Sequence, residues 1–219
     1  MRNFLFGVAL ASACTVPAFA EEVCKLKRYA VIPFATDETA HIFVPATLDG
    51  RSTHLMLDTG AFWSLIRSDL AKSLNLKIKK SVDVRLIDLA GNKIDQIATV
   101  TEFKLGPIAF SGDVDLVVGG DSPNRSIDQD GGILGLNLLT QMDLEIDNAG
   151  KTISLFSQDH CKGDGVHWAD EAVTLKYKRQ KPEQPLGTRL KQKIDKNQID
   201  SPIVVAELEG EPISVLFDT

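Results

Sequence analysis

The residues Asp58-Thr59-Gly60 combine side chains and a spacing that could support hydrolysis. A carboxylate held in a tight loop can take a proton from water, provided that a second carboxyl group lies beside it and shares a proton with it. The apolar segment Leu55 to Leu57 comes directly before Asp58, so we expect a strand to deliver the carboxylate into the loop. Gly60 would allow close backbone approach there, and Thr59 would lock the loop by hydrogen bonding.

The approach to this loop is repeated later in the sequence. Aligned without a gap, residues 204–219 match residues 44–59. The identical pairs are Val44/Val204, Ala46/Ala206, Leu48/Leu208, Gly50/Gly210, Asp58/Asp218 and Thr59/Thr219. Because the match ends on a second Asp-Thr pair, we predict that a second lobe starts here and supplies Asp218 and Thr219. We also expect the sequence to be a fragment, because no turn glycine and no partner strands follow this apolar strand.

Strand signals dominate the part of the chain around Asp58. Residues 41–47 and 54–57 flank Asp49-Gly50, a dipeptide that readily adopts positive φ, so they are predicted to form a hairpin. Further strands are expected at 82–89 and 93–100, which flank Ala90-Gly91-Asn92, and at 103–110, 114–118, 144–147 and 152–156. Many short strands of this kind predict a small all-β lobe that resembles a barrel.

Helical signals are few and short. Ser68-Asp69 is expected to cap a helix that runs through Leu74, and Asn137 to cap a single helical turn through Met142. Between residues 159 and 200 the chain is polar and is interpreted as a linker, with one strand expected at 172–177.

Taken together, these motifs resemble the retropepsin-like aspartic proteases. The resemblance covers about Ala30 to Phe156, and it predicts a retropepsin-like β-barrel lobe. It implies that Asp58 and a second aspartate activate water for peptide-bond hydrolysis, without a metal or an organic cofactor. The remaining site residues that it implies are Thr59, Gly60, Ala61 and Thr219 in the catalytic loops, Ile133-Leu134-Gly135 beneath the first loop, and Ala90-Gly91-Asn92 in a flap-like hairpin.

The resemblance leaves the partner of Asp58 open. Asp218 could complete a pair of aspartates within one chain, or Asp58 could meet its own copy across the two-fold axis of a homodimer. A different class of function is a non-catalytic peptide-binding or structural module that keeps the same fold. Phe62 favours this second class, because many relatives carry a polar residue at that position.

The N-terminus has the pattern of a secretory signal. Arg2 precedes an apolar run from Phe4 to Ala13, and Ala18-Phe19-Ala20 fits a cleavage site. We therefore expect residues 1–20 to be removed and the protein to be exported, either to the periplasm or out of the cell. Lobe 1 is assigned to residues 21–160, and residues 161–219 are assigned to the linker and the start of lobe 2.

Export also bears on the remaining cysteines, Cys24 and Cys161, which stand before and after lobe 1. A disulfide between them would tie the entry of the lobe to its exit, although two unpaired thiols are the alternative. The formal net charge is −6 and no basic cluster is present, so nucleic acid is not an expected partner. No apolar run after the signal is long enough to span a bilayer. The four histidines lack the spacing of metal ligands, and the expected partner is a peptide or protein substrate.

Overall fold

The computed structural model describes residues 26–81, 86–87, 93–120, 124–159, 177–178, 203–216 and 218–219. Strands predominate in these ranges and are accompanied by two short helices, so the prediction of an all-β lobe is confirmed. The predicted signal sequence, the flap tip at Ala90-Gly91-Asn92 and the cysteines Cys24 and Cys161 lie outside the described residues. Within those residues, no helix is long and apolar enough to cross a membrane.

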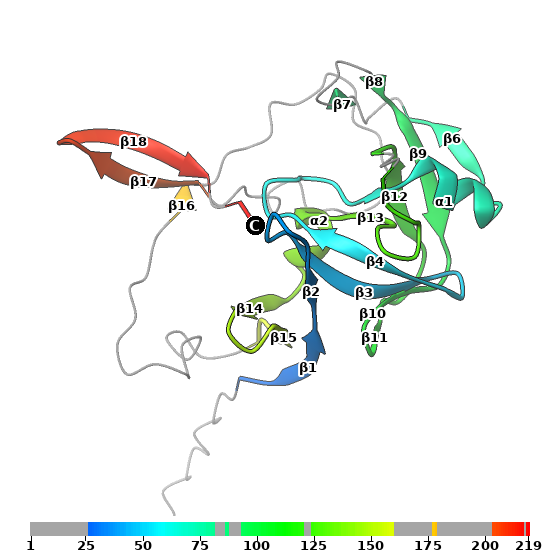
Figure 1. Cartoon of the computed structure of the whole chain (residues 1–219), viewed down its shortest axis with the longest axis horizontal. Helices are drawn as coiled ribbons and strands as arrows, with labels where there is room; N and C mark the ends of the chain where they lie inside the picture. Colours follow the sequence, from blue (N-terminus) through cyan, green and yellow to red (C-terminus); the bar gives the residue numbers. More distant parts are fainter. Residues whose placement is uncertain are drawn as a thin grey trace, which may run out of the picture.

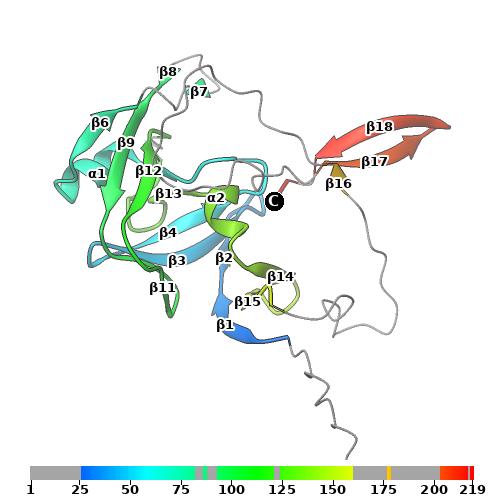
Figure 2. The ribbon, with the colours of Figure 1, turned by 180° about the vertical axis from the view of Figure 1, so that it is seen from behind.

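Most strands of the lobe belong to one curled sheet (Figures 1 and 2). Its order is β11-β10-β3-β4-β13-β5-β12-β9-β6, and β2 pairs with β3 at the side. The bounds are β2 (Ala35–Thr36), β3 (Ile42–Leu48), β4 (Arg51–Leu57), β5 (Leu65–Ile66), β6 (Ile78–Lys80), β9 (Gln96–Val100), β10 (Phe103–Leu105), β11 (Ile108–Ala109), β12 (Val114–Val118) and β13 (Gly132–Leu134).

Smaller sheets complete the lobe. The order β1-β15-β14 forms one of them, and β7 pairs with β8 in another. Their bounds are β1 (Arg28–Pro33), β14 (Asp143–Asp147), β15 (Thr152–Phe156), β7 (Leu86–Ile87) and β8 (Lys93–Ile94). The predicted hairpin of 144–147 with 152–156 is therefore confirmed. The predicted strand at 93–100 is divided into β8 and β9, and β9 pairs with β6 and β12 rather than with β7.

The hairpin of β3 and β4 turns at Asp49-Gly50, as the sequence predicts. Both residues have positive φ, 44° for Asp49 and 82° for Gly50, which is the combination that a tight two-residue hairpin turn requires. The Asp49 carboxylate also accepts hydrogen bonds from the backbone N–H groups of Thr101 at 2.9 Å and Glu102 at 2.8 Å. The turn is thus fixed to the connection between β9 and β10, and the register of β4 is fixed with it.

Alternation along β4 separates the core from the opposite face of the sheet. Leu55 and Leu57 are fully buried and belong to the main hydrophobic core, together with Val44 of β3 and Leu134 of β13. Met56 lies between the two leucines and faces the other way, because successive side chains of a strand point to opposite faces. The next residue on the face of Met56 is Asp58, directly after the strand ends.

Helix α1 spans Ser68–Ser73, so Ser68, the first residue of the predicted cap, already lies within the helix. Arg67 occupies the N-cap position without a side-chain cap bond, so the prediction that Ser68-Asp69 caps the helix is wrong. Asp69 instead pairs with the Arg67 guanidinium, with oxygen–nitrogen distances of 3.0 and 2.5 Å. Arg67 is 3% exposed, and its Nη1 donates to the carbonyl oxygens of Arg125 at 2.9 Å and Asp130 at 3.1 Å. This buried cation needs these partners, and the Asp69 carboxylate that pairs with it also accepts from the backbone N–H of Leu70 in the first turn, at 2.8 Å.

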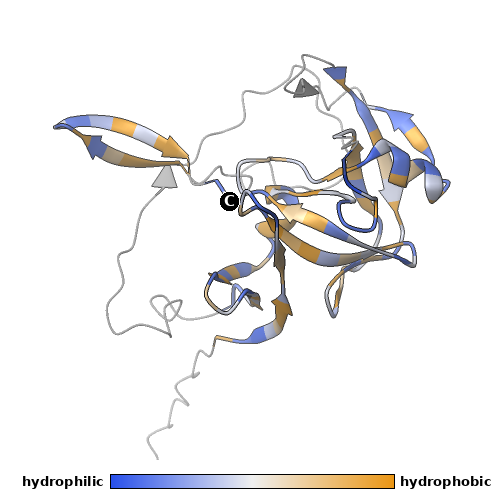
Figure 3. Cartoon of the chain, in the orientation of Figure 1, coloured by the Kyte–Doolittle hydropathy of each residue, from blue (hydrophilic) through white to orange (hydrophobic). Residues whose placement is uncertain are grey.

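A separate sheet of order β16-β17-β18 contains the repeated segment, with β16 (Tyr177–Lys178), β17 (Ile203–Leu208) and β18 (Glu211–Leu216). Its hairpin has the register of β3 and β4: Leu208 pairs with Glu211 as Leu48 pairs with Arg51. Its turn residues also have positive φ, 53° for Glu209 and 87° for Gly210. Apolar residues are spread along this hairpin (Figure 3), and Leu208 is 60% exposed whereas its equivalent Leu48 is fully buried.

Candidate active site

Asp58 is held at the end of β4 by bonds from two directions. Its backbone N–H donates to the carbonyl oxygen of Leu134 at 3.1 Å, which continues the pairing of β4 with β13 past the end of the strand. Its carboxylate accepts from the backbone N–H of Ala61 at 2.8 Å, which closes the loop on itself. The carboxylate is thereby fixed above the sheet, on the face opposite the main core.

The segment Ile133-Leu134-Gly135 lies beside and beneath this loop. β13 is parallel to β4 and antiparallel to β5, so Leu134 pairs with Leu57 while Ile133 pairs with both Met56 and Leu65. Just beyond β13, the backbone N–H of Leu136 donates to the carbonyl oxygen of Ala61 at 2.9 Å. The loop that carries Asp58 therefore rests on backbone contributed by residues about 75 positions later in the chain.

Gly135 is a point of close backbone approach in this contact. A β-carbon placed there would lie 2.8 Å from the carbonyl oxygen of Ala61 and 2.8 Å from the carbonyl carbon and oxygen of Trp63. These are backbone atoms, and they cannot move aside as a flexible side chain can. Glycine is needed here for close approach, and not for its conformation, because its φ of −100° is open to other residues.

We expect Gly135→Ala to lower the free energy of unfolding by about 3 kcal/mol, because overpacking against fixed backbone forces the loop away from β13. Urea unfolding of the two proteins measures this difference. Gly50→Ala is the matched comparison: its φ is 82°, and no atom lies within 4 Å of the added carbon. It should cost about 1 kcal/mol from backbone strain alone. Equal losses for the two variants would contradict the close-contact argument.

A polar network joins the far end of the loop to α2 (Leu136–Leu139). The Asn137 side-chain oxygen accepts from the backbone N–H of Ser64 at 2.7 Å and from its hydroxyl at 2.8 Å. The Ser64 hydroxyl oxygen in turn accepts from the backbone N–H of Gly135 at 2.9 Å, and Ser64 is fully buried. The prediction that Asn137 caps the helix is wrong, since the helix begins after Gly135 and the amide is used across the chain instead.

Asp218 and Thr219 meet this loop from the other end of the chain. The backbone N–H of Gly60 donates to an Asp218 carboxylate oxygen at 3.2 Å. The Thr219 hydroxyl accepts from the backbone N–H of Thr59 at 3.2 Å and donates to the carbonyl oxygen of Leu57 at 3.2 Å. A β-carbon at Gly60 would lie 2.7–2.9 Å from the three carboxyl atoms of Asp218, so glycine permits the approach. Two Asp-Thr pairs separated by 160 residues therefore share one site.

The electrostatics of Asp58 follow from this neighbourhood. Burial raises the pKa of Asp58, and the nearby Asp218 carboxylate raises it further, because two like charges at close range cannot both form cheaply. Hydrogen bonds from the Ala61 and Gly60 backbone partly offset the increase in this pKa. A carboxyl group that keeps its proton above the usual range, next to a second carboxyl group, can serve as the acid of an acid–base pair.

The sequence between these elements matches a known family. Residues 44–138 match the aspartyl protease family, a span that contains the whole Asp58 loop, Ser64 and the Ile133-Leu134-Gly135 segment. The resemblance to the aspartyl proteases is confirmed. No curated protein matches the chain.

Solved structures that are similar to this chain include two proteins. The first is a retropepsin-like aspartic protease from Rickettsia conorii, with 20% sequence identity and a TM-score of 0.40; the match covers 61% of this chain and 95% of that one. The second is the retroviral protease-like domain of Ddi1 from Leishmania major, with 16% identity and a TM-score of 0.34; the match covers 55% of this chain and 98% of that one.

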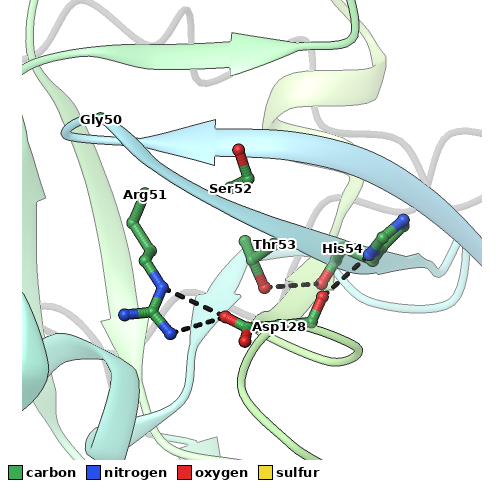
Figure 4. A pocket seen from close by; sticks show the side chains of 6 residues that line it. All are labelled: Gly50, Arg51, Ser52, Thr53, His54 and Asp128. Carbon is green, nitrogen blue, oxygen red and sulfur yellow. Dashed lines mark hydrogen bonds and ion pairs between the residues drawn. The ribbon is translucent and has the colours of Figure 1, made fainter.

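The lobe also has a shallow pocket of about 460 Å³ at the start of β4, away from Asp58 (Figure 4). Arg51 spans it and bonds to the Asp128 carboxylate at 3.1 and 2.6 Å, and His54 Nδ1 lies 2.9 Å from the Asp128 carbonyl oxygen. The Thr53 hydroxyl donates to the carbonyl oxygen of Ile127. These residues form hydrogen bonds to the segment just before β13, so we interpret the residues that line the pocket as structural contacts that position β13.

A second group of contacts holds the same segment through Arg125. The Arg125 guanidinium pairs with the Asp37 carboxylate and stacks 4.6 Å from the centre of the Phe43 ring. Asp37 also accepts from the backbone N–H of His41 at 2.9 Å. Although burial alone would raise it, hydrogen bonds from His41, Arg125 and Thr39 hold the pKa of Asp37 far below its usual range. The carboxylate therefore stays charged, and the tie stays formed, in mildly acidic solution.

Within the described residues, no three His, Cys, Asp or Glu side chains gather in an arrangement that could hold a metal ion. The site residues that sequence reasoning assigned to the two loops and to Ile133-Leu134-Gly135 are brought together. The roles of Asn137 and the Ser64 hydroxyl were missed. Their bond joins positions 73 residues apart, and only the resemblance, which includes both residues, pointed to this region.

Proposed function

We propose that this protein is an exported aspartic endopeptidase in which Asp58 and Asp218 of one chain activate the water that cleaves a peptide bond. The observation that carries the proposal is the double contact of the two Asp-Thr pairs: Gly60 N–H with the Asp218 carboxylate, and Thr59 N–H with the Thr219 hydroxyl. A binding module has no evident need to place two carboxyl groups together against their repulsion. Export is supported by the signal pattern of residues 1–20.

The chemistry follows from one proton shared by two carboxyl groups. Burial and the neighbouring Asp218 charge raise the pKa of Asp58, and two carboxyl groups this close titrate as a pair that shares one proton. In the proposed mechanism that proton starts on Asp58. Asp218 then takes a proton from the water, and the water oxygen attacks the substrate carbonyl carbon. At the same time Asp58 gives its proton to the carbonyl oxygen of the substrate. When the tetrahedral intermediate collapses, the carbon–nitrogen bond breaks, the nitrogen receives a proton from Asp218, and the carbonyl oxygen returns its proton to Asp58.

This mechanism predicts how cleavage depends on pH. The pair works only while it holds one proton, so the rate should rise and then fall between about pH 3 and 7. The falling limb should lie above the ordinary aspartate pKa of about 3.9, because burial and the Asp218 charge both raise the pKa of Asp58. The measurement is kcat/KM for cleavage of an unbiased peptide mixture at intervals of pH.

A chelator in every assay excludes contaminating metallopeptidases, and a spectrum of the folded protein at each pH excludes loss by unfolding. A rate that continues to rise through pH 7 would contradict the shared-proton mechanism. Failure of a folded protein to cleave any peptide at any pH would favour the non-catalytic peptide-binding module.

A further inference from the structure

Directly paired residues form a continuous row across the face of the sheet that carries Asp58. Partners in a β-ladder have their side chains on the same face, so the pairing of neighbouring strands traces the row. From β4 to β6 its members are Met56, Ile133, Leu65, Val117, Ile97 and Lys79. We refer to these residues as the Met56–Lys79 row. It starts two residues before Asp58 and ends on a cation.

The first part of the row is apolar and separate from the main core. In the middle of the row Leu65 and Val117 are buried, 8% and 1% exposed, and form a small cluster against which Ile133, Ile97 and Trp63 pack. Ile133 and Ile97 are only partly buried, unlike the fully buried Leu55 and Leu57 on the other face. Ile133 lies on the strand next to β4 and Ile97 four strands away, and such partly open apolar side chains offer contact area to the apolar residues of a bound peptide.

The row ends on a positive charge that has no ion pair within the part of the lobe that the structure describes. Lys79 is exposed, and so is Lys77 two positions earlier; neither has an ion pair among the described residues. The neighbouring Lys80 and Lys93 differ, since both pair with Asp95, at 3.5 and 3.0 Å. Asp115 is the acid on the same face of β12, and it accepts from the Thr99 hydroxyl at 2.6 Å. Lys79 therefore has its charge available to a partner.

The row also has a length that a peptide can match. Five strand-to-strand steps separate β4 from β6, and each step is about 4.8 Å, so the path along the sheet is at most about 24 Å. An extended peptide advances about 3.3 Å per residue. A chain of about seven residues bound at Asp58 can therefore reach Lys79, with apolar side chains near the cleaved bond and its outer residues near the cation.

We propose that Lys79 selects peptides that carry an acidic residue several positions from an apolar cleavage site. This inference rests on the proposed function, because Asp58 fixes where the bound peptide begins its path. It identifies the substrate class as apolar peptides with an acidic outer segment, and Lys79 as a residue that determines specificity and takes no part in the bond cleavage.

The test compares labelled peptides of about ten residues with Leu-Phe at the centre and Glu at the outer positions of one side, against the same peptides with Gln. For the wild type, kcat/KM should be higher for the Glu peptide than for the Gln peptide. Lys79→Glu should lower kcat/KM for the Glu peptide about fivefold and leave kcat/KM for the Gln peptide nearly unchanged. The preference should also shrink between about 0.05 and 0.5 M salt, because exposed charges are screened.

Lys72→Glu is the matched control. It makes the same change in net charge on an exposed residue of α1, a helix that packs through Leu70 and Ala71 onto the main core on the other face of the sheet. An equal loss in Lys72→Glu, or equal cleavage of Glu and Gln peptides by the wild type, would overturn the role of Lys79.

Binding separates this inference from the proposed function. Fluorescence anisotropy of the same peptides with Asp58→Asn protein measures charge preference without cleavage. Tighter binding of the Glu peptide that is lost when Lys79→Glu is added supports the inference. This holds even if the wild type cleaves no peptide, because absence of cleavage would contradict only the proposed endopeptidase activity. Binding that does not distinguish Glu from Gln overturns the inference, whatever the cleavage assay shows.

Discussion

Asp58→Asn is expected to lower kcat/KM for peptide cleavage by about a thousandfold, the scale at which a positioned acid–base group contributes to catalysis. An amide cannot hold the shared proton or return it to the intermediate. The loop itself should survive, because the amide oxygen of Asn can still accept the hydrogen bond from the Ala61 N–H that closes it at 2.8 Å. The measurement is steady-state cleavage by wild type and variant at the pH of highest wild-type activity.

The stability of the same variant gives an independent readout. The pKa of Asp58 is raised in the folded protein, so the wild type loses stability as pH rises from the ordinary aspartate pKa of about 3.9 through the raised value. Asn carries no charge and avoids this loss. The variant should therefore melt at an equal or higher temperature than the wild type at pH 7, and the gain should vanish near pH 3.

Asp113→Asn is a suitable control for both the cleavage and the stability measurements. It removes a carboxylate as Asp58→Asn does, and Asp113 is exposed in the loop before β12. It should leave cleavage unchanged. If Asp58→Asn keeps more than a tenth of the wild-type kcat/KM, Asp58 does not belong to the proton-sharing pair, and the proposed mechanism fails.

Features of the fold that depend on neighbouring residues were predictable from the sequence. The Asp49-Gly50 turn follows from a dipeptide that tolerates positive φ, and the burial of Leu55 and Leu57 follows from simple alternation. The same alternation carries Asp58 onto the open face of the sheet. The sequence match between residues 44–59 and 204–219 extends to the backbone, because Glu209-Gly210 turns as Asp49-Gly50 does and gives the same register.

Features that depend on distant partners were not predictable in the same way. Asn137 and Asp69 have the residue types of helix caps, and local reasoning assigned them to that role. In the folded chain Asn137 bonds to Ser64, and Asp69 bonds to the buried cation of Arg67, whose other partners lie in the segment 125–130. A buried donor that would otherwise lack a partner costs more than a missing cap, so the long-range bond takes precedence.

The positioning of Asp58 likewise depends on a segment that lies far from it in the sequence. Residues 125–130 are fastened to β4 by Arg51 and His54, to α1 by Arg67, and to the start of β3 by Arg125. These bonds fix where β13 begins. β13 in turn supports the Asp58 loop through the Leu134 carbonyl oxygen. The Asp58 carboxylate is thus positioned by charged residues that take no part in the proposed chemistry.

Asp218→Asn is expected to reduce cleavage as severely as Asp58→Asn, by about a thousandfold, if the pair forms within one chain. The physical reason is the contact already described: the Asp218 carboxylate lies against Gly60, and the Thr219 hydroxyl bridges the Thr59 N–H and the Leu57 carbonyl oxygen. A site built from two copies of Asp58 would not contain Asp218. Nearly full activity of the Asp218→Asn variant would therefore assign the site to a homodimer.

Dilution and mixing resolve the remaining arrangements. Activity from one chain rises in proportion to protein concentration, whereas a site shared between two copies loses specific activity on dilution below its dissociation constant. A mixture of Asp58→Asn and Asp218→Asn proteins should stay inactive if each site uses one chain. Recovered cleavage in that mixture would show that Asp58 of one copy meets Asp218 of another, since only that exchange rebuilds an intact pair from the two variants.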